Sequence, residues 1–100
     1  MALLHVALQE GFSHDEVFIA VGGSIRHRFA DVTTKNQIGF ADAVDLDVSA
    51  GVIDLRVRVP TRNIDQTVPV TLEASVYVGL SISVGGQLTS TISPSPFGYL

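Results

Sequence analysis

A serine, a histidine and an aspartate stand side by side at Ser13-His14-Asp15, and these are the three residue types of a hydrolytic triad. A triad requires three side chains that converge through successive hydrogen bonds, whereas neighbours on one loop splay apart. The segment Gly79–Ser83 comes near a nucleophile elbow but lacks the second glycine and a following helix. We therefore expect no catalytic residues and a protein that is not an enzyme.

Carboxylate and imidazole side chains suggest two kinds of metal site. Four aspartates lie close together along the chain: Asp42, Asp45, Asp47 and Asp54. Their oxygens could bind Ca²⁺, but Asp45 and Asp47 alternate with apolar residues, which favours a solvated strand face paired with the arginines of the following strand. Three histidines come from separate elements: His5, His14 and His27. They lack the close spacing typical of a zinc site, so we expect no metal and no cofactor.

The arginines are the one concentrated positive feature of the chain: Arg26, Arg28, Arg56, Arg58 and Arg62. A nucleic-acid surface would need a net positive domain with interleaved aromatic residues, whereas the formal net charge here is −4. The chain also lacks tryptophan and has only 2 tyrosines, so the aromatic platforms that bind sugars are scarce. We expect no nucleic-acid partner.

Loops at one end of a β-sandwich are the usual place for a binding site. We expect loops at 11–15, 30–38 and 60–67. These loops could bring together four polar residues: His14, Asp31, Lys35 and Arg62. Their convergence around a pocket would indicate a small-molecule or glycan-binding site.

Alternation of apolar and polar residues dominates the whole chain, as in strands that bury one face. The composition, 46% hydrophobic and 16% charged, is that of a chain with enough apolar residues for a core. Several short strands separated by turn signals predict an all-β fold, a single antiparallel β-sandwich of about seven or eight strands, immunoglobulin-like or transthyretin-like.

The alternation also predicts how neighbouring strands pair, because a slip of one residue would turn every side chain to the wrong face. Around Ala50-Gly51 it predicts a hairpin in which Val48 faces Ile53. Prolines do not donate to a ladder, so the segment between Pro60 and Pro69 is predicted to cross between sheets.

Two Gly-Gly turns are predicted to form three-residue hairpin loops. In the first, Gly22-Gly-Ser24, Val17 is expected to face Phe29 and Val21 to face Ile25. In the second, Gly85-Gly-Gln87, Val84 is expected to face Leu88.

Two of the predicted strands carry apolar side chains on both faces. A lone sandwich buries one face of each sheet, so this excess indicates an oligomer, a covering tail or a partner site. The predicted interaction surface consists of Phe18, Ala20, Tyr77, Phe97 and Tyr99. We expect a homo-oligomer or a protein partner, with residues 1–93 as the sandwich domain and residues 94–100 as a Pro-rich tail packed on the domain or on a neighbour.

The chain has no run of about 18 apolar residues that would span a membrane, and its N-terminus lacks the cationic start of a secretory signal. We expect a cytoplasmic protein with no membrane partner. The absence of cysteine excludes disulfides and thiolate chemistry.

Several short phrases together resemble small, stand-alone bacterial proteins with an immunoglobulin-like or transthyretin-like β-sandwich and no established activity. The phrases are Leu8-Gln-Glu-Gly-Phe12, Ile38-Gly-Phe-Ala41, Val59-Pro-Thr-Arg62 and Pro96-Phe-Gly-Tyr99. The stretch 33–51 is also similar to carboxypeptidase-regulatory-like sandwich modules. The resemblance implies a fold but carries over no site residues. We therefore predict a non-catalytic protein-interaction or structural module that self-associates, with a small-molecule or glycan-binding sandwich as the alternative.

Overall fold

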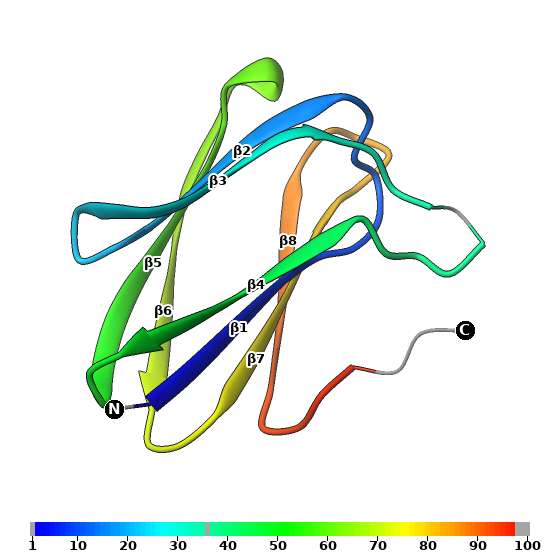
Figure 1. The fold of residues 1–100 in the computed structure, drawn as a ribbon. Coiled ribbons are helices and arrows are strands. Elements are labelled where there is room, and N and C mark those ends of the chain that lie inside the picture. The colour runs from blue at the N-terminus through cyan, green and yellow to red at the C-terminus, as the bar shows by residue number, and fades with distance from the viewer. Residues whose placement is uncertain (1, 36, 98–100) are drawn as a thin grey trace.

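Two four-stranded sheets packed face to face make up the protein in the computed structural model, which describes residues 2–35 and 37–97 (Figure 1). The strands are β1 (Ala2–Leu8), β2 (Asp15–Val21), β3 (Ser24–Val32), β4 (Asp42–Val48), β5 (Gly51–Val59), β6 (Ile64–Leu72), β7 (Val76–Ile82) and β8 (Leu88–Ser93). A 3₁₀ turn, Pro60–Arg62, joins β5 to β6. The predicted all-β sandwich is confirmed.

The strand order is β4-β1-β7-β8 in one sheet and β3-β2-β5-β6 in the other. The second sheet is antiparallel throughout, but β1 and β7 are parallel, with Leu4 opposite Val76 and Leu8 opposite Leu80. The prediction of a purely antiparallel sandwich was therefore wrong at this pair. A parallel pair needs a long connection, and here the connection contains the whole of the second sheet.

The chain changes sheets between β4 and β5, where a hairpin was predicted. β4 pairs with β1, and β5 pairs with β2 and β6, so Val48 does not face Ile53. Two strands that face one core from opposite sheets show the same alternation of apolar and polar residues as the two strands of a hairpin. The alternation therefore could not distinguish the two arrangements. The predicted crossover at 60–69 was also wrong, because β5 and β6 form a hairpin, and Pro69 lies inside the edge strand β6, where a proline is tolerated.

The Gly-Gly hairpins follow the predicted pairing in part. In the β2–β3 hairpin Val17 faces Phe29 as predicted, but a register shift near the turn places Ile25 opposite Ala20 instead of Val21. In the β7–β8 hairpin Leu88 faces Ile82, and Val84 lies fully exposed at the turn. This shift of two residues keeps the same side chains on the inner face, so the alternation alone could not detect it.

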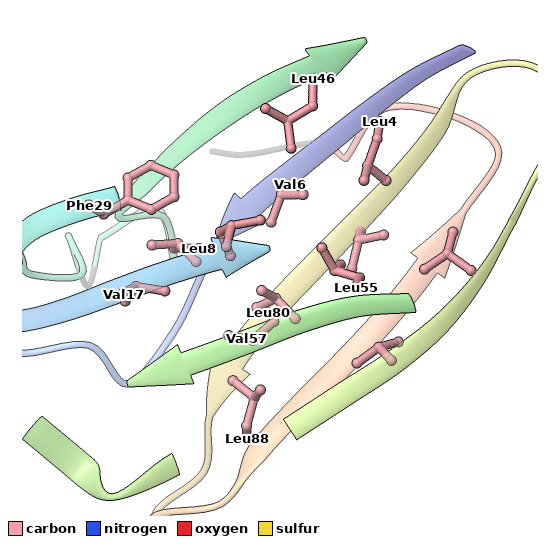
Figure 2. Close-up of a cluster of buried hydrophobic side chains, with 14 of the residues drawn as sticks. Leu4, Val6, Leu8, Val17, Phe29, Leu46, Leu55, Val57, Leu80 and Leu88 are labelled. Atoms are coloured by element: carbon pink, nitrogen blue, oxygen red, sulfur yellow. The ribbon is translucent and has the colours of Figure 1, made fainter. Parts of the chain in front are cut away.

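The core lies between the sheets and is filled by the inward-facing side chains of the central strands (Figure 2). Val6 and Leu80 of the first sheet and Leu55 and Val57 of the second are completely buried. Each such side chain contributes about 1.5–3 kcal/mol to folding. The faces and edges outside this core are therefore where polar chemistry and partners must be sought.

Candidate functional site

A buried carboxylate, Asp15, ties the start of β2 to the turn between β5 and β6. Its side chain is 2% exposed, and among the residues that the structure describes it is the one charged residue that is buried. Asp15 Oδ1 accepts hydrogen bonds from Thr61 Oγ1 at 2.6 Å and from Arg62 Nε at 3.1 Å. Asp15 Oδ2 accepts from the Ser13 amide at 2.8 Å and from Arg62 Nη2 at 3.1 Å. We call Asp15, Thr61 and Arg62 the carboxylate clamp.

The backbone next to the carboxylate clamp is equally restrained. Arg62 Nη2 also donates to the Gly11 carbonyl oxygen at 2.9 Å. Gly11 has a φ of +87°, and a Cβ at this position would meet the Ile82 carbonyl oxygen at 1.9 Å, so only glycine fits. The clamp therefore fixes the loop before β2 against both sheets.

Two opposing effects set the pKa of Asp15. Burial raises the pKa, while hydrogen bonds from Arg62, Thr61 and the Ser13 amide and the charge of Arg62 lower it, with a net lowering. The carboxylate is ionised at neutral pH, and both of its oxygens accept hydrogen bonds from the protein itself. This arrangement stabilises the fold and does not supply a general acid.

Two residues of the predicted loop site meet at the same end of the molecule. His14 Nδ1 lies 2.7 Å from Asp31 Oδ1, with side chains that are 77% and 74% exposed. Both residues have a φ near +50° (52° and 53°). Arg62, by contrast, is engaged in the carboxylate clamp, and Lys35 lies in the β3–β4 connection, where its backbone pairs with Phe40. No pocket is found within residues 2–35 and 37–97, and the small-molecule alternative stays a prediction.

The predicted interaction residues divide between the two outer faces of the sandwich. Phe18 is half-buried on the outside of the β3-β2-β5-β6 sheet, where the guanidinium carbons of Arg28 and Arg58 each lie 5.9 Å from its ring centroid. Ala20, two residues along β2, is buried on the same face. Tyr77 lies on the outside of the other sheet, so the structure does not bring it together with Phe18.

Tyr77 belongs to a polar row across the β4-β1-β7-β8 sheet. Its ring centroid lies 5.4 Å from that of His5, and His5 Nδ1 lies 2.5 Å from Asp45 Oδ1. The expected pairing of Asp45 with an arginine was wrong because β4 and β5 lie in different sheets; Arg56 instead binds Asp65 on β6. Sequence reasoning missed this row and the carboxylate clamp, since their members lie far apart along the chain.

The C-terminal part of the predicted surface is only partly described. Phe97 is half-buried and follows the end of β8, whereas Tyr99 lies outside the described residues. The third histidine, His27, packs its ring edge-on against Phe29 with 4.5 Å between centroids. No cluster of three metal-ligating side chains is found in the part of the chain that the structure describes.

The four edge strands differ in how they are protected from pairing with another chain. Charges, prolines and irregularities on an edge strand prevent such pairing. β4 carries three aspartates, β6 contains Asp65 and Pro69, and β3 carries two arginines and register shifts. β8, with the sequence Leu-Thr-Ser-Thr-Ile-Ser, has no charge, proline or register shift.

Two of the exposed large apolar side chains lie on the β7–β8 hairpin. Four large hydrophobic residues are exposed among the described residues: Ile25, Val52, Val84 and Ile92. Val84 lies in the β7–β8 turn, and Ile92, which is 50% exposed, lies on β8 itself. On the opposite side of the sandwich, Arg26 Nη2 donates to the Asp47 carbonyl oxygen at 2.9 Å and links the edges of β3 and β4. Within residues 2–35 and 37–97, β8 is therefore the edge strand without a charge, a proline or a register shift.

No protein-family model matches the chain, and a search of curated proteins finds no match. The resemblance to small bacterial sandwich proteins therefore stays a prediction. No helix in the described residues is long and apolar enough to cross a membrane.

Proposed function

We propose that this protein is a non-catalytic protein-interaction module whose binding element is the free edge of β8. The observation that carries this proposal is the unprotected character of β8, in contrast to the three charged or interrupted edges. An edge strand presents a row of unpaired backbone N–H and C=O groups, which can pair with an extended segment of another chain.

The chemistry of β8 suits the addition of a strand. Backbone hydrogen bonds contribute about 0.5–1.5 kcal/mol each in net terms, and a six-residue strand offers several of them. Ile92 adds a half-exposed apolar side chain, and Thr89 and Thr91 add hydroxyl groups without charge. Affinity would come from the backbone and selectivity from these alternating side chains.

We also propose that the sandwich is of the transthyretin type. Immunoglobulin constant domains place their first and second strands in one sheet, whereas β1 and β2 here belong to different sheets. The division of eight strands into two sheets of four supports the same assignment.

Site-specific photo-crosslinking tests the proposed binding element without assuming a partner. A photoreactive benzoylphenylalanine is placed at position 91 on β8 or, as a matched control, at position 67 on the edge strand β6. Each purified variant is irradiated alone and in a cell extract of the source organism, and adducts are identified by mass. We expect an adduct at position 91 that is absent at position 67 and is abolished by Thr89→Lys. Equal adducts at the two positions, or none at position 91, would contradict the proposal.

A further inference from the structure

We infer that copies of this protein stack, with the outer face of the β3-β2-β5-β6 sheet of one copy on the outer face of the β4-β1-β7-β8 sheet of the next. Phe18 and Tyr77 are half-buried on these two faces, which point away from each other within one copy. A contact between the unlike faces of two copies brings the two aromatic side chains together. The contact goes beyond the proposed function, because it does not use the β8 edge.

Three side chains form a row across β3, β2 and β5, which we call the arginine row. Arg28 and Arg58 lie directly opposite Phe18 on its two sides, and each guanidinium carbon is 5.9 Å from the ring centroid. Arg28 donates to Glu16 through Nε and Nη2, so its Nη1 is left for another acceptor. No carboxylate among the described residues forms an ion pair with Arg58. The arginine row therefore offers a partner one aromatic ring flanked by two cations.

A second row, which we call the acidic row, crosses β4, β1 and β7 on the other outer face. Asp45 and Tyr77 lie directly opposite His5 on its two sides. The Asp45 side chain uses Oδ1 on His5 but is 63% exposed, so Oδ2 is left for another donor. Asp47, two residues along β4, adds a second exposed carboxylate on the same face. The acidic row therefore offers two rings beside a pair of carboxylates.

The two rows match when the copies stack in the way that the two sheets of one sandwich do. Within a copy, β3 lies beside β4 and β6 lies beside β8. Sheets that pack face to face lie about 10 Å apart, with strand directions that are nearly aligned. The same arrangement between copies puts β3 over the second copy's β4, β2 over its β1 and β5 over its β7. It gives three pairs, each with one member from either row: Arg28 with Asp45, Phe18 with His5, and Arg58 with Tyr77.

Each of these pairs is favourable on chemical grounds. A guanidinium group forms charge-assisted hydrogen bonds with a carboxylate, which suits Arg28 and the second copy's Asp45. Aromatic rings attract each other in offset or edge-to-face geometry, and a cation is attracted to the face of a tyrosine ring. Aromatic and arginine side chains are also enriched at the centres of protein interfaces.

The distribution of charge selects a contact between unlike faces. Two arginine rows placed together would oppose cations, and two acidic rows would bring the carboxylates of Asp45 and Asp47 next to their own copies. An interface between unlike faces is heterologous, so each copy in a stack keeps one free face of each kind. The stack therefore grows with protein concentration as an open chain unless its rotation closes a ring.

A complementation experiment tests this inference, because a heterologous contact needs only one intact face from each copy. Every chain carries Thr89→Lys, which closes the β8 edge to association, and this chain is the reference. Arg58→Glu then breaks the arginine row, and Asp45→Lys breaks the acidic row. By light scattering over a dilution series, we expect each variant alone to associate at least about tenfold more weakly than the reference. An equal mixture of the two variants should form dimers and nothing larger, because the faces left over are both broken.

Two controls separate a lost contact from a damaged fold. Glu73→Lys makes the same change of charge as Asp45→Lys at an exposed position between β6 and β7, and it should associate like the reference. Arg58→Gln removes the charge without reversing it and should weaken association less than Arg58→Glu does. Circular dichroism of each variant shows whether the sandwich is intact.

Three outcomes would overturn the inference. The first is a reference chain that stays monomeric up to the highest concentration at which it is soluble. The second is a row variant that associates as strongly as the reference. The third is a mixture that stays monomeric while the reference associates, because this result would exclude a contact between unlike faces. None of these outcomes affects the proposed role of β8, which the photo-crosslinking experiment decides separately.

Discussion

The carboxylate clamp and the β8 edge differ in where their polar groups find partners. In the clamp, both oxygens of Asp15 accept hydrogen bonds from Ser13, Thr61 and Arg62 of the same chain. Along β8, one side pairs with β7, and no strand among the described residues is hydrogen-bonded to the other side. Groups that are satisfied internally hold the fold, whereas groups left at an unprotected edge are available to a second chain.

The largest effect should come from breaking the clamp. Arg62→Ala removes the cation beside a buried carboxylate, and an uncompensated buried charge of this kind costs about 3–5 kcal/mol. Urea unfolding should show this loss in the free energy of unfolding. Arg58→Ala, which removes an arginine that stacks over Phe18 on an outer face, is the control and should cost about 1 kcal/mol or less. Equal losses in the two variants would mean that the clamp does not stabilise the fold.

The pH dependence of the free energy of unfolding should reveal the interactions of Asp15 in the carboxylate clamp. The folded-state pKa of Asp15 is lowered, so its contribution is fully present above the unfolded value near 3.8 and is lost as the pH falls through the folded pKa. The free energy of unfolding of wild type should therefore exceed that of Asp15→Asn at pH 6, and the difference should shrink below about pH 4. A difference that stays constant from pH 6 to pH 2.5 would contradict the assigned pKa direction.

A charge on β8 should affect association and leave the fold largely intact. Ile92→Lys places a charge at the free edge of β8, and we expect the yield of the photo-crosslinked adduct from position 91 to fall at least about tenfold, which corresponds to 1.4 kcal/mol. Mass spectrometry of the irradiated samples measures this change. Thr67→Lys on β6 is the matched control and should leave the adduct from position 91 unchanged, so equal weakening by both variants would argue against β8 as the binding element.

The smallest effect should come from the exposed pair at the loop end. Asp31→Asn removes the charge that faces His14, and asparagine tolerates the positive φ of this position. Exposed ion pairs contribute about 0–1 kcal/mol, so thermal unfolding should change little. A loss as large as that of Arg62→Ala would indicate a structural role that the exposed geometry does not suggest.

Local patterns predicted much of the fold. The alternation around Val17, Ile19 and Leu55 correctly assigned inward-facing residues, because the side-chain period of a strand is a local property. It could not assign sheet partners: β4 and β5 have matching patterns but lie in different sheets. The two-residue shift at Leu88 escaped detection for the same reason, since it leaves the inner face unchanged.

By itself the sequence determined an all-β chain and most of its inward-facing residues. Only the tertiary structure decided that Asp15 meets Arg62, that Phe18 and Tyr77 lie on opposite faces, and that residues 88–93 form an edge strand. Strand alternation follows from the geometry of adjacent residues, whereas contacts between distant segments depend on how the chain crosses between sheets.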